Sequence, residues 1–202
     1  MSTIPVNLAV EDELSEAVLR RLLRHTGRGY AVGTVFGRSG YGYLRNTITG
    51  WNRAARGIPL VVLTDLDRCP CPAALIAEWL PRYQHANLLL RVAVREVESW
   101  VLADRENLPE FLRVAPNSIP LNPDTIPDPK ALLVNAAARS RSGEIRSRVA
   151  PRRGSSAKQG PDYNSCLSEF VYRSWDVDSS AASSPSLSRT VARLRLFTPT
   201  YE

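Results

Sequence analysis

The residues of this chain best suited to chemistry are acids that directly follow predicted strands. Residues 58–64 form an apolar run that is typical of a buried strand, and Asp65 and Asp67 come immediately after it. Because side chains two residues apart in a strand point the same way, we expect the two carboxylates to converge. Converging like charges repel unless a cation lies between them, and carboxylate oxygens are ligands that Mg²⁺ and Mn²⁺ prefer. The spacing therefore predicts a divalent metal site.

The same pattern recurs after two further predicted strands. The strand over residues 4–10 ends at Glu11, and the strand over residues 87–94 precedes Glu96 and Glu98. The carboxyl ends of parallel strands share one edge of an α/β sheet, and ligands bind at that edge. The predicted metal ligands are therefore Glu11, Asp65, Asp67, Glu96 and Glu98.

Asp12 and Glu13 also follow the first strand, but a structural role explains them better. They stand at the start of a predicted helix over residues 13–25. Acids at this position accept hydrogen bonds from the free N–H groups of the first turn and interact favourably with the helix dipole. We interpret both residues as part of the helix N-terminus.

Strands and helices alternate through the first half of the chain. Beside the segments already named, we expect a strand over residues 30–36 and helices over 44–55, 72–83 and 97–113, the last interrupted at Pro109. This alternation predicts an α/β fold, with a mainly parallel central sheet and helices on both faces. We assign residues 1–115 to this α/β fold and expect it to be the catalytic core, because it carries the predicted metal ligands.

Residues 116–202 are expected to form an irregular and helical C-terminal extension that packs on the core. Helices are predicted over residues 129–138, 166–172 and 187–196. The Ser-, Arg- and Gly-rich segment 140–160 is predicted to be a mobile loop. It carries most of the seven basic residues between Arg139 and Lys158, against the single acid Glu144. Such a basic segment suits a polyanion ligand or, alternatively, a solvated loop.

A glycine-rich segment precedes the predicted helix over residues 44–55. Gly37, Gly40 and Gly42 could cradle a phosphate, but their spacing fits no specific fingerprint, so we interpret them as a strand-to-helix turn. Tyr41 and Tyr43 could stack on bases or could be ordinary surface tyrosines.

Composition points to a folded protein outside the membrane. Apolar residues make up 44% of the 202 residues, and no apolar run approaches the roughly 18 residues of a transmembrane helix. The N-terminal segment lacks the order of a signal peptide, and the three cysteines are an odd number. Cys69 and Cys71 form a C-x-C pair, which we interpret as turn cysteines rather than a zinc site. We expect a cytoplasmic protein.

Three blocks of the sequence resemble the signature segments of Toprim-like proteins. They are NLAVEDELSEAVLRRLL (residues 7–23), PLVVLTDLD (59–67) and AVREVESWVLAD (93–104). The resemblance is closest to the small Toprim-like proteins of the DUF4276 family, which are related to the nuclease half of OLD-family proteins. A looser match follows at KQGPDY (158–163). One departure is Asp12, which stands where the family usually has a glycine.

The resemblance implies metal-dependent cleavage of phosphodiester bonds, and therefore a nuclease, with DNA favoured over RNA. Two hard cations, Mg²⁺ or Mn²⁺, about 4 Å apart would hold the attacking water and stabilise the leaving oxygen. Asp65 and Asp67 would ligate metal, Glu11 would ligate metal or act as general acid or base, and Glu98 with Glu96 would complete a second metal site.

Basic residues of the C-terminal extension have implied roles as well. Lys158 is the candidate for stabilising the charge of the reacting phosphorus, and Arg152 and Arg153 are candidate phosphate contacts. The resemblance also implies a role in bacterial defence against phage or foreign DNA. Since the chain has no P-loop motif, an ATPase would have to be a separate partner.

Two alternatives stay open. The chain could be a catalytically degenerate subunit that binds nucleic acid or a partner protein, and the glycine-to-acid departure at Asp12 favours this. It could also be a phosphohydrolase or nucleotidyl transferase that acts on small nucleotides with the same metal site.

Overall fold

The computed structural model describes residues 3–37, 39–80 and 82–200. Within these residues the chain forms one four-stranded, all-parallel sheet with the strand order β2-β1-β3-β4. From β1 the chain moves to β2 on one side and then crosses to β3 on the other. The chain connections therefore run to opposite sides of β1 and β3. Open α/β sheets bind ligands at the carboxyl ends of two such strands. The strands are β1 (Ile4–Val10), β2 (Tyr30–Gly37), β3 (Leu60–Asp65) and β4 (Leu88–Ala93).

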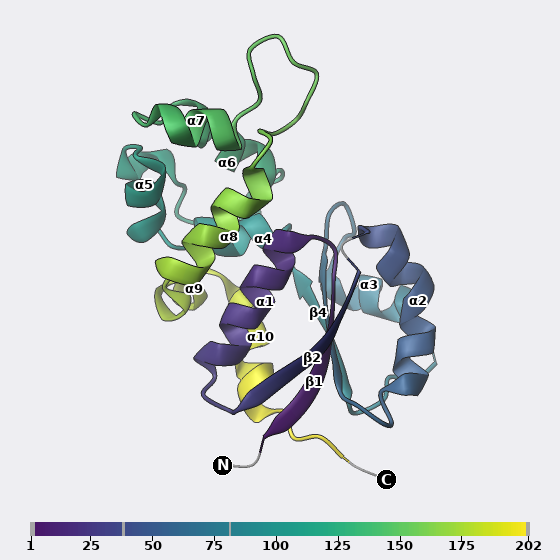
Figure 1. The fold of residues 1–202 in the computed structure, drawn as a ribbon. Helices are drawn as coiled ribbons and strands as arrows, with labels where there is room; N and C mark the ends of the chain where they lie inside the picture. The colour runs from purple at the N-terminus through teal and green to yellow at the C-terminus, as the bar shows by residue number, and fades with distance from the viewer. Residues whose placement is uncertain (1–2, 38, 81, 201–202) are drawn as a thin grey trace.

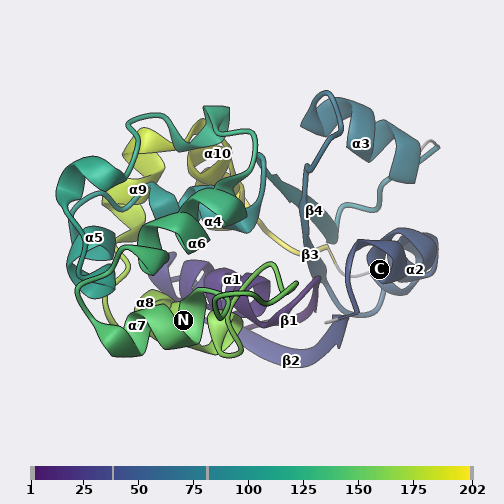
Figure 2. The same ribbon diagram turned by 90° about the horizontal axis from the view of Figure 1, so that it is seen from above.

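Helices cover both faces of the sheet (Figure 1). On one face lie α2 (Tyr41–Ala54) and α3 (Pro72–Trp79). On the other lie α1 (Glu13–His25), α4 (Val97–Leu102) and α10 (Pro185–Leu196), and the view along the strands separates the two layers (Figure 2). The predicted α/β architecture with a parallel sheet is confirmed.

The central strand β3 is apolar from Leu60 to Leu63 because it is buried on both faces of the sheet. Val61 and Leu63 of β3 pack into the hydrophobic cluster on the α1 side. Leu60 and Val62 pack into a second cluster with α2 and α3. Successive strand residues point to opposite faces, so a sheet covered on both sides needs a continuous apolar run.

Helix boundaries agree with the sequence for α1 and for α6 (Pro129–Ala138) and differ for the other helices. Helix α3 ends at Trp79, before the predicted residue 83. The predicted helix over residues 13–25 coincides with α1. Helix α2 begins at Tyr41, earlier than predicted. The predicted helix over residues 97–113 is interrupted before Pro109 instead of at it, and forms α4 and α5 (Asn107–Leu112). Pro109 lies in the first turn of α5, where its missing N–H costs no intrahelical hydrogen bond.

The segment after residue 115 is mostly helical and shares the hydrophobic cluster on the α1 side of the sheet. Helix α8 packs on α1, α6 packs on α4, and α10 packs on β4. Beside α10, the helices are α6 (Pro129–Ala138), α7 (Gly143–Val149), α8 (Tyr163–Arg173) and α9 (Val177–Ser183), with short 3₁₀ turns η1 (Pro116–Ser118) and η2 (Pro123–Thr125).

The prediction of a loop throughout residues 140–160 is wrong for its first half, which contains α7. Ser142 caps this helix, accepting a hydrogen bond from Ile145 N at 3.3 Å. Ile145 and Val149 are one turn apart and both are buried. A serine cap and one apolar pair are a weak signal among so many arginines, which is why composition suggested a loop.

No helix in the described parts of the chain is long and apolar enough to cross a membrane.

The glycine-rich turn fixes the carboxyl end of β1. A Cβ at Gly37 would lie 2.1 Å from the carbonyl oxygen of Val10, and the φ angle of Gly37 is 101°. The N–H of Gly40 donates to the carbonyl oxygen of Glu11 at 3.1 Å. The turn therefore holds the backbone at the first predicted acid.

We expect Gly37→Ala to lower the free energy of unfolding by more than about 1 kcal/mol, because both the φ angle and the contact forbid a side chain. Urea denaturation would measure the change. Gly50→Ala is the matched control, since a Cβ at Gly50 in α2 meets nothing within 4 Å. There the substitution should be neutral or stabilise by up to about 1 kcal/mol. Equal effects of the two substitutions would contradict the role of Gly37.

Candidate active site at the carboxyl edge of the sheet

Glu11 bridges the two central strands at the switch point. It follows Val10, which pairs with Leu63 of β3. One carboxylate oxygen, Oε1, accepts hydrogen bonds from Thr64 Oγ1 at 2.5 Å and from Asp65 N at 2.9 Å. No described residue donates to the other oxygen, Oε2. Glu11 is therefore held in one orientation by the end of β3, with an oxygen left free.

Asp65 is the last residue of β3 and connects this strand to α4. Its Oδ1 accepts a hydrogen bond from Val97 N at 2.8 Å, at the N-terminus of α4. The positive end of the helix dipole favours a carboxylate there. Within the described residues, Oδ2 of Asp65 accepts no hydrogen bond. Like Glu11, Asp65 has one fixed and one free oxygen.

Glu98 is the most deeply buried acid of the edge, with 1% of its surface exposed. Its Oε1 accepts a hydrogen bond from Tyr163 Oη at 3.0 Å and lies 3.3 Å from the ammonium nitrogen of Lys130. Its Oε2 is buried and has no hydrogen-bond partner. A buried carboxylate oxygen without a partner is costly, and it is the clearest sign that the edge lacks a positive charge.

The acids at the edge raise one another's pKa values. Burial is the largest cause for Glu11, Asp65 and Glu98, whose pKa values all lie above their ordinary values. Neighbouring carboxylates add to the increase; for Asp65 these are Glu98, Glu11, Asp12 and then Asp67. Burial lowers the pKa of Lys130, but Glu98 and other acids together raise it by more. The net shift of this pKa is therefore upward. Lys130 therefore does not fully offset the burial and mutual repulsion of these acids.

Asp67 does not continue the strand alternation on which its prediction rested. Strand β3 ends at Asp65, and Asp67 has a left-handed φ of 48°, which an aspartate tolerates better than most residues. Its N–H donates to Arg95 O at 3.0 Å, and the guanidinium of Arg95 donates back to its carbonyl at 3.1 Å. Asp67 is exposed on the rim of the edge, while Asp65 lies inside it.

Glu96 has a structural contact that the sequence did not indicate. Its Oε2 accepts a hydrogen bond from Lys130 N at 2.9 Å, in the first turn of α6. Burial is the main reason that the pKa of Glu96 rises to about 7. Glu96 thus joins the end of β4 to α6 and also brings the Lys130 backbone to the edge.

A cavity of about 570 Å³ opens beside the acids. Asp67 and Glu96 line it together with Lys158, which is carried by the loop between α7 and α8. This loop is closed at its base, where the N–H of Gly160 donates to Val149 O at 2.9 Å. In Figure 1 the loop projects at the top of the view, on the side where the strands end. Of the predicted basic residues, Lys158 therefore lies near the acids. Arg152 and Arg153 are exposed on the same loop and do not line the cavity.

Lys130 and Tyr163 belong to the edge but were not among the predicted site residues. A lysine in the first turn of a helix opposes the helix dipole, and this was a sequence signal that Lys130 has an acidic partner. Tyr163 ends the segment that loosely resembled the family. Its pKa lies well above the ordinary value, because of burial and the adjacent Glu98.

The other residues of the third block are structural. Trp100 is fully buried, and its indole N–H donates to Ser186 Oγ at 2.7 Å. Asp104 is buried and accepts hydrogen bonds from Asn107 N at 2.9 Å and Asp176 N at 2.8 Å. The carboxylates of this block that reach the edge are those of Glu96 and Glu98.

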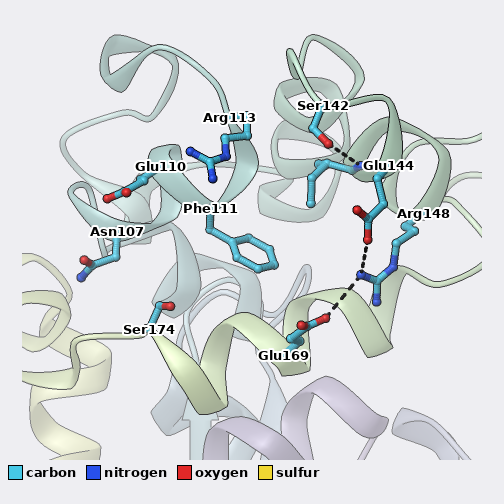
Figure 3. A pocket seen from close by; sticks show the side chains of 10 residues that line it. Asn107, Glu110, Phe111, Arg113, Ser142, Glu144, Arg148, Glu169 and Ser174 are labelled. Atoms are coloured by element: carbon cyan, nitrogen blue, oxygen red, sulfur yellow. Dashed lines mark hydrogen bonds and ion pairs between the residues drawn. The ribbon is translucent and has the colours of Figure 1, made fainter.

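A second cavity, of about 520 Å³, lies among the C-terminal helices (Figure 3). Arg148 forms ion pairs there with Glu144 at 3.4 Å and with Glu169 at 3.3 Å, and the Phe111 ring lies between these residues and Arg113 (Figure 3). Glu144 and Glu169 are thus paired with Arg148, and the predicted acids of the sheet edge do not line this cavity. It is not part of the acid cluster.

As the side chains stand, no three His, Cys, Asp or Glu residues among residues 3–37, 39–80 and 82–200 could hold one metal ion. No protein-family model, curated protein or solved structure matches the chain. Function therefore has to be inferred from the geometry of the edge.

We expect Lys130→Met to lower the free energy of unfolding by about 1.5–3 kcal/mol, because a charged hydrogen bond to a buried carboxylate is lost. The double variant Lys130→Met/Glu98→Gln should recover most of this loss, since the unpaired charge is then absent. Urea denaturation would measure both changes.

Arg173→Met is the control, because Arg173 pairs with Glu169 at 2.6 Å but is 75% exposed. Its effect should stay below about 1 kcal/mol. A Lys130→Met variant as stable as Arg173→Met would show that Lys130 does not offset the negative charge of the acids.

Proposed function

We propose that the chain is a Mg²⁺- or Mn²⁺-dependent nuclease with a Toprim-like site at the carboxyl edge of its sheet. One observation carries the proposal: acids that follow three different strands meet at this edge, and each has one oxygen fixed by protein donors and one to which no described residue donates a hydrogen bond. These acids are Glu11, Asp65 and Glu98. Burying them together is unfavourable unless a cation joins them.

The donor set suits a hard divalent cation. Glu11 Oε2, Asp65 Oδ2 and Glu98 Oε2 are carboxylate oxygens, and Asp67 and Glu96 on the rim offer more. Because no three of these side chains are arranged to hold an ion as they stand, binding requires rotation of at least one of them. A bound ion would supply Lewis-acid activation of water and neutralisation of the phosphate.

The protein's own residues would orient and balance this site. Thr64 and Val97 fix the carboxylates of Glu11 and Asp65 by hydrogen bonds. Lys130 offsets part of the negative charge on Glu98. Lys158 lines the adjoining cavity, where an ammonium group could pair with a phosphate oxygen of the substrate. Arg152 and Arg153 on the same loop could contact the phosphates that flank the site.

The biological setting follows from the Toprim-like resemblance alone. It suggests an effector of bacterial defence that cleaves foreign DNA and acts beside a separate ATPase subunit. The basic loop and the net charge of +6 agree with a polyanionic partner.

A degenerate, binding-only subunit is the second candidate, and Asp12 favours it. The side chain of Asp12 caps α1 and accepts a hydrogen bond from Ser15 N at 2.8 Å. It also adds negative charge that raises the pKa values of Glu11, Asp65 and Glu98. An acid in place of a glycine could change how a metal or substrate approaches the backbone of β1.

Cleavage of a supercoiled plasmid tests the enzyme. We expect nicking that requires Mn²⁺ or Mg²⁺ and that falls at least about 100-fold in Asp65→Asn, since metal coordination contributes several kcal/mol to such reactions. Asparagine can still accept the hydrogen bond from Val97 N, so the fold should persist.

Glu110→Gln, in the second cavity, is the control and should cleave like the wild type. Plasmid binding without cleavage would support the binding-only subunit. Equal cleavage by Asp65→Asn and the wild type would overturn the proposed site.

Thermal unfolding tests metal binding without any reaction. Mn²⁺ at about 100 times its Kd should raise the Tm by about 5–10 °C, because an ion that binds only the folded state stabilises it. Glu98→Gln should lose most of this increase. Asp178→Asn, at an exposed ion pair on α9, should retain it. An identical shift in both variants would place the Mn²⁺ elsewhere.

A further inference from the structure

We infer that the cavity beside the acid cluster holds an unstacked nucleotide of a single-stranded nucleic acid, with its base against Tyr41. This inference rests on the proposed nuclease function and adds the form of the substrate to it.

The cavity has the size and the lining for one nucleotide. Its volume of about 570 Å³ lies in the usual range of sites for small organic groups. Tyr41 and Leu66 provide aromatic and apolar surface, and Arg68 and Lys158 provide positive charge. Asp67, Glu96 and Asp128 also line it, so phosphate enters most readily when a divalent cation is present.

Tyr41 is held in place before any ligand binds. It is the first residue of α2, after the glycine-rich turn. Its ring packs edge-on against Trp79 with the ring centroids 5.2 Å apart, and its hydroxyl accepts a hydrogen bond from the Trp79 indole N–H at 3.4 Å. A fixed aromatic side chain beside a phosphate site is the usual platform for an unpaired base.

A double helix cannot use this platform. Its bases stay stacked inside the duplex, so an aromatic wall can reach a base only after that base is unstacked. The candidate ligands are also recessed, since Glu98 is 1% exposed and Glu11 is only partly exposed. The α7–α8 loop brings Lys158 to the cavity from a separate part of the chain, which narrows the approach further. A flexible single strand can bend into such a site.

Fluorescence anisotropy of a labelled oligo(dT) strand, alone and annealed to oligo(dA), tests the inference. Ca²⁺ is present to neutralise the carboxylates, and a gel run afterwards verifies that the strand is intact. The wild type should bind the single strand more tightly than the duplex. Tyr41→Ala and Tyr41→Leu should weaken single-strand binding about five- to 150-fold, the range expected for loss of one stacked base.

Two variants separate stacking from packing. Tyr41→Phe keeps the aromatic face and should bind like the wild type. Tyr43→Ala should also bind like the wild type, because the Tyr43 ring packs against Trp51 at 5.7 Å and does not line the cavity. Thermal unfolding of each variant identifies any loss of fold, and Tyr41→Leu retains apolar packing if Tyr41→Ala does not fold.

Three results would overturn the inference: equal affinity for single strand and duplex, wild-type affinity in Tyr41→Leu, or competition by thymidine monophosphate as effective as that of the strand. The last result would instead assign the cavity to a free nucleotide. Tyr41-dependent binding of single strands without any metal-dependent cleavage would uphold this inference and overturn the proposed nuclease. Cleavage confined to duplex DNA and unaffected by Tyr41→Leu would do the reverse.

Discussion

Electrostatic repulsion among carboxylates that are buried or half-buried is the constraint on which this edge of the sheet depends. The parallel pairing of β1 with β3 brings Glu11 next to Asp65, and β4 delivers Glu98 beside them. Hydrogen bonds from Thr64 and from backbone N–H groups, and the ammonium of Lys130, each offset part of the repulsion. They do not remove it, because burial and mutual repulsion still raise the acids' pKa values. Strongly shifted groups gathered at one site are a physical indication of function.

The sequence predicts best what depends on short spacing. The apolar run before Asp65, the helical periodicity over residues 13–25 and the Asp12 cap are all local signals, and the structure agrees with each of them. The common edge of the strands followed from one general rule about parallel sheets. That rule needs only the strand ends, so it could place Glu11 and Glu98 near Asp65 without any knowledge of the contacts between them.

Contacts between distant segments could not be predicted in this way. Lys130 reaches Glu98 because α6 packs on α4. Tyr163 reaches Glu98 because it is the first residue of α8, and this end of the helix lies at the same edge of the sheet. The alternation rule also failed at Asp67, because it applies within a strand and the chain leaves β3 at Asp65. Sequence spacing therefore located the acids but could not tell which oxygens were free or which cation opposed them.

Structural roles explain only one of the two oxygens of each carboxylate. Glu11 Oε1 accepts a hydrogen bond that joins β1 to β3, and Asp65 Oδ1 accepts one from the first N–H of α4. Glu98 Oε1 accepts a hydrogen bond from Tyr163 and forms an ion pair with Lys130. Amide or hydroxyl side chains could make comparable contacts without three mutually repelling charges. Such residues would stabilise the fold more, since a buried charge is costly unless it is fully paired. The unpaired second oxygens, above all the buried Oε2 of Glu98, are the feature that structure alone leaves unexplained. A cation could pair with these oxygens once at least one of the side chains rotates, which is why we interpret the edge as a site and not only as a junction.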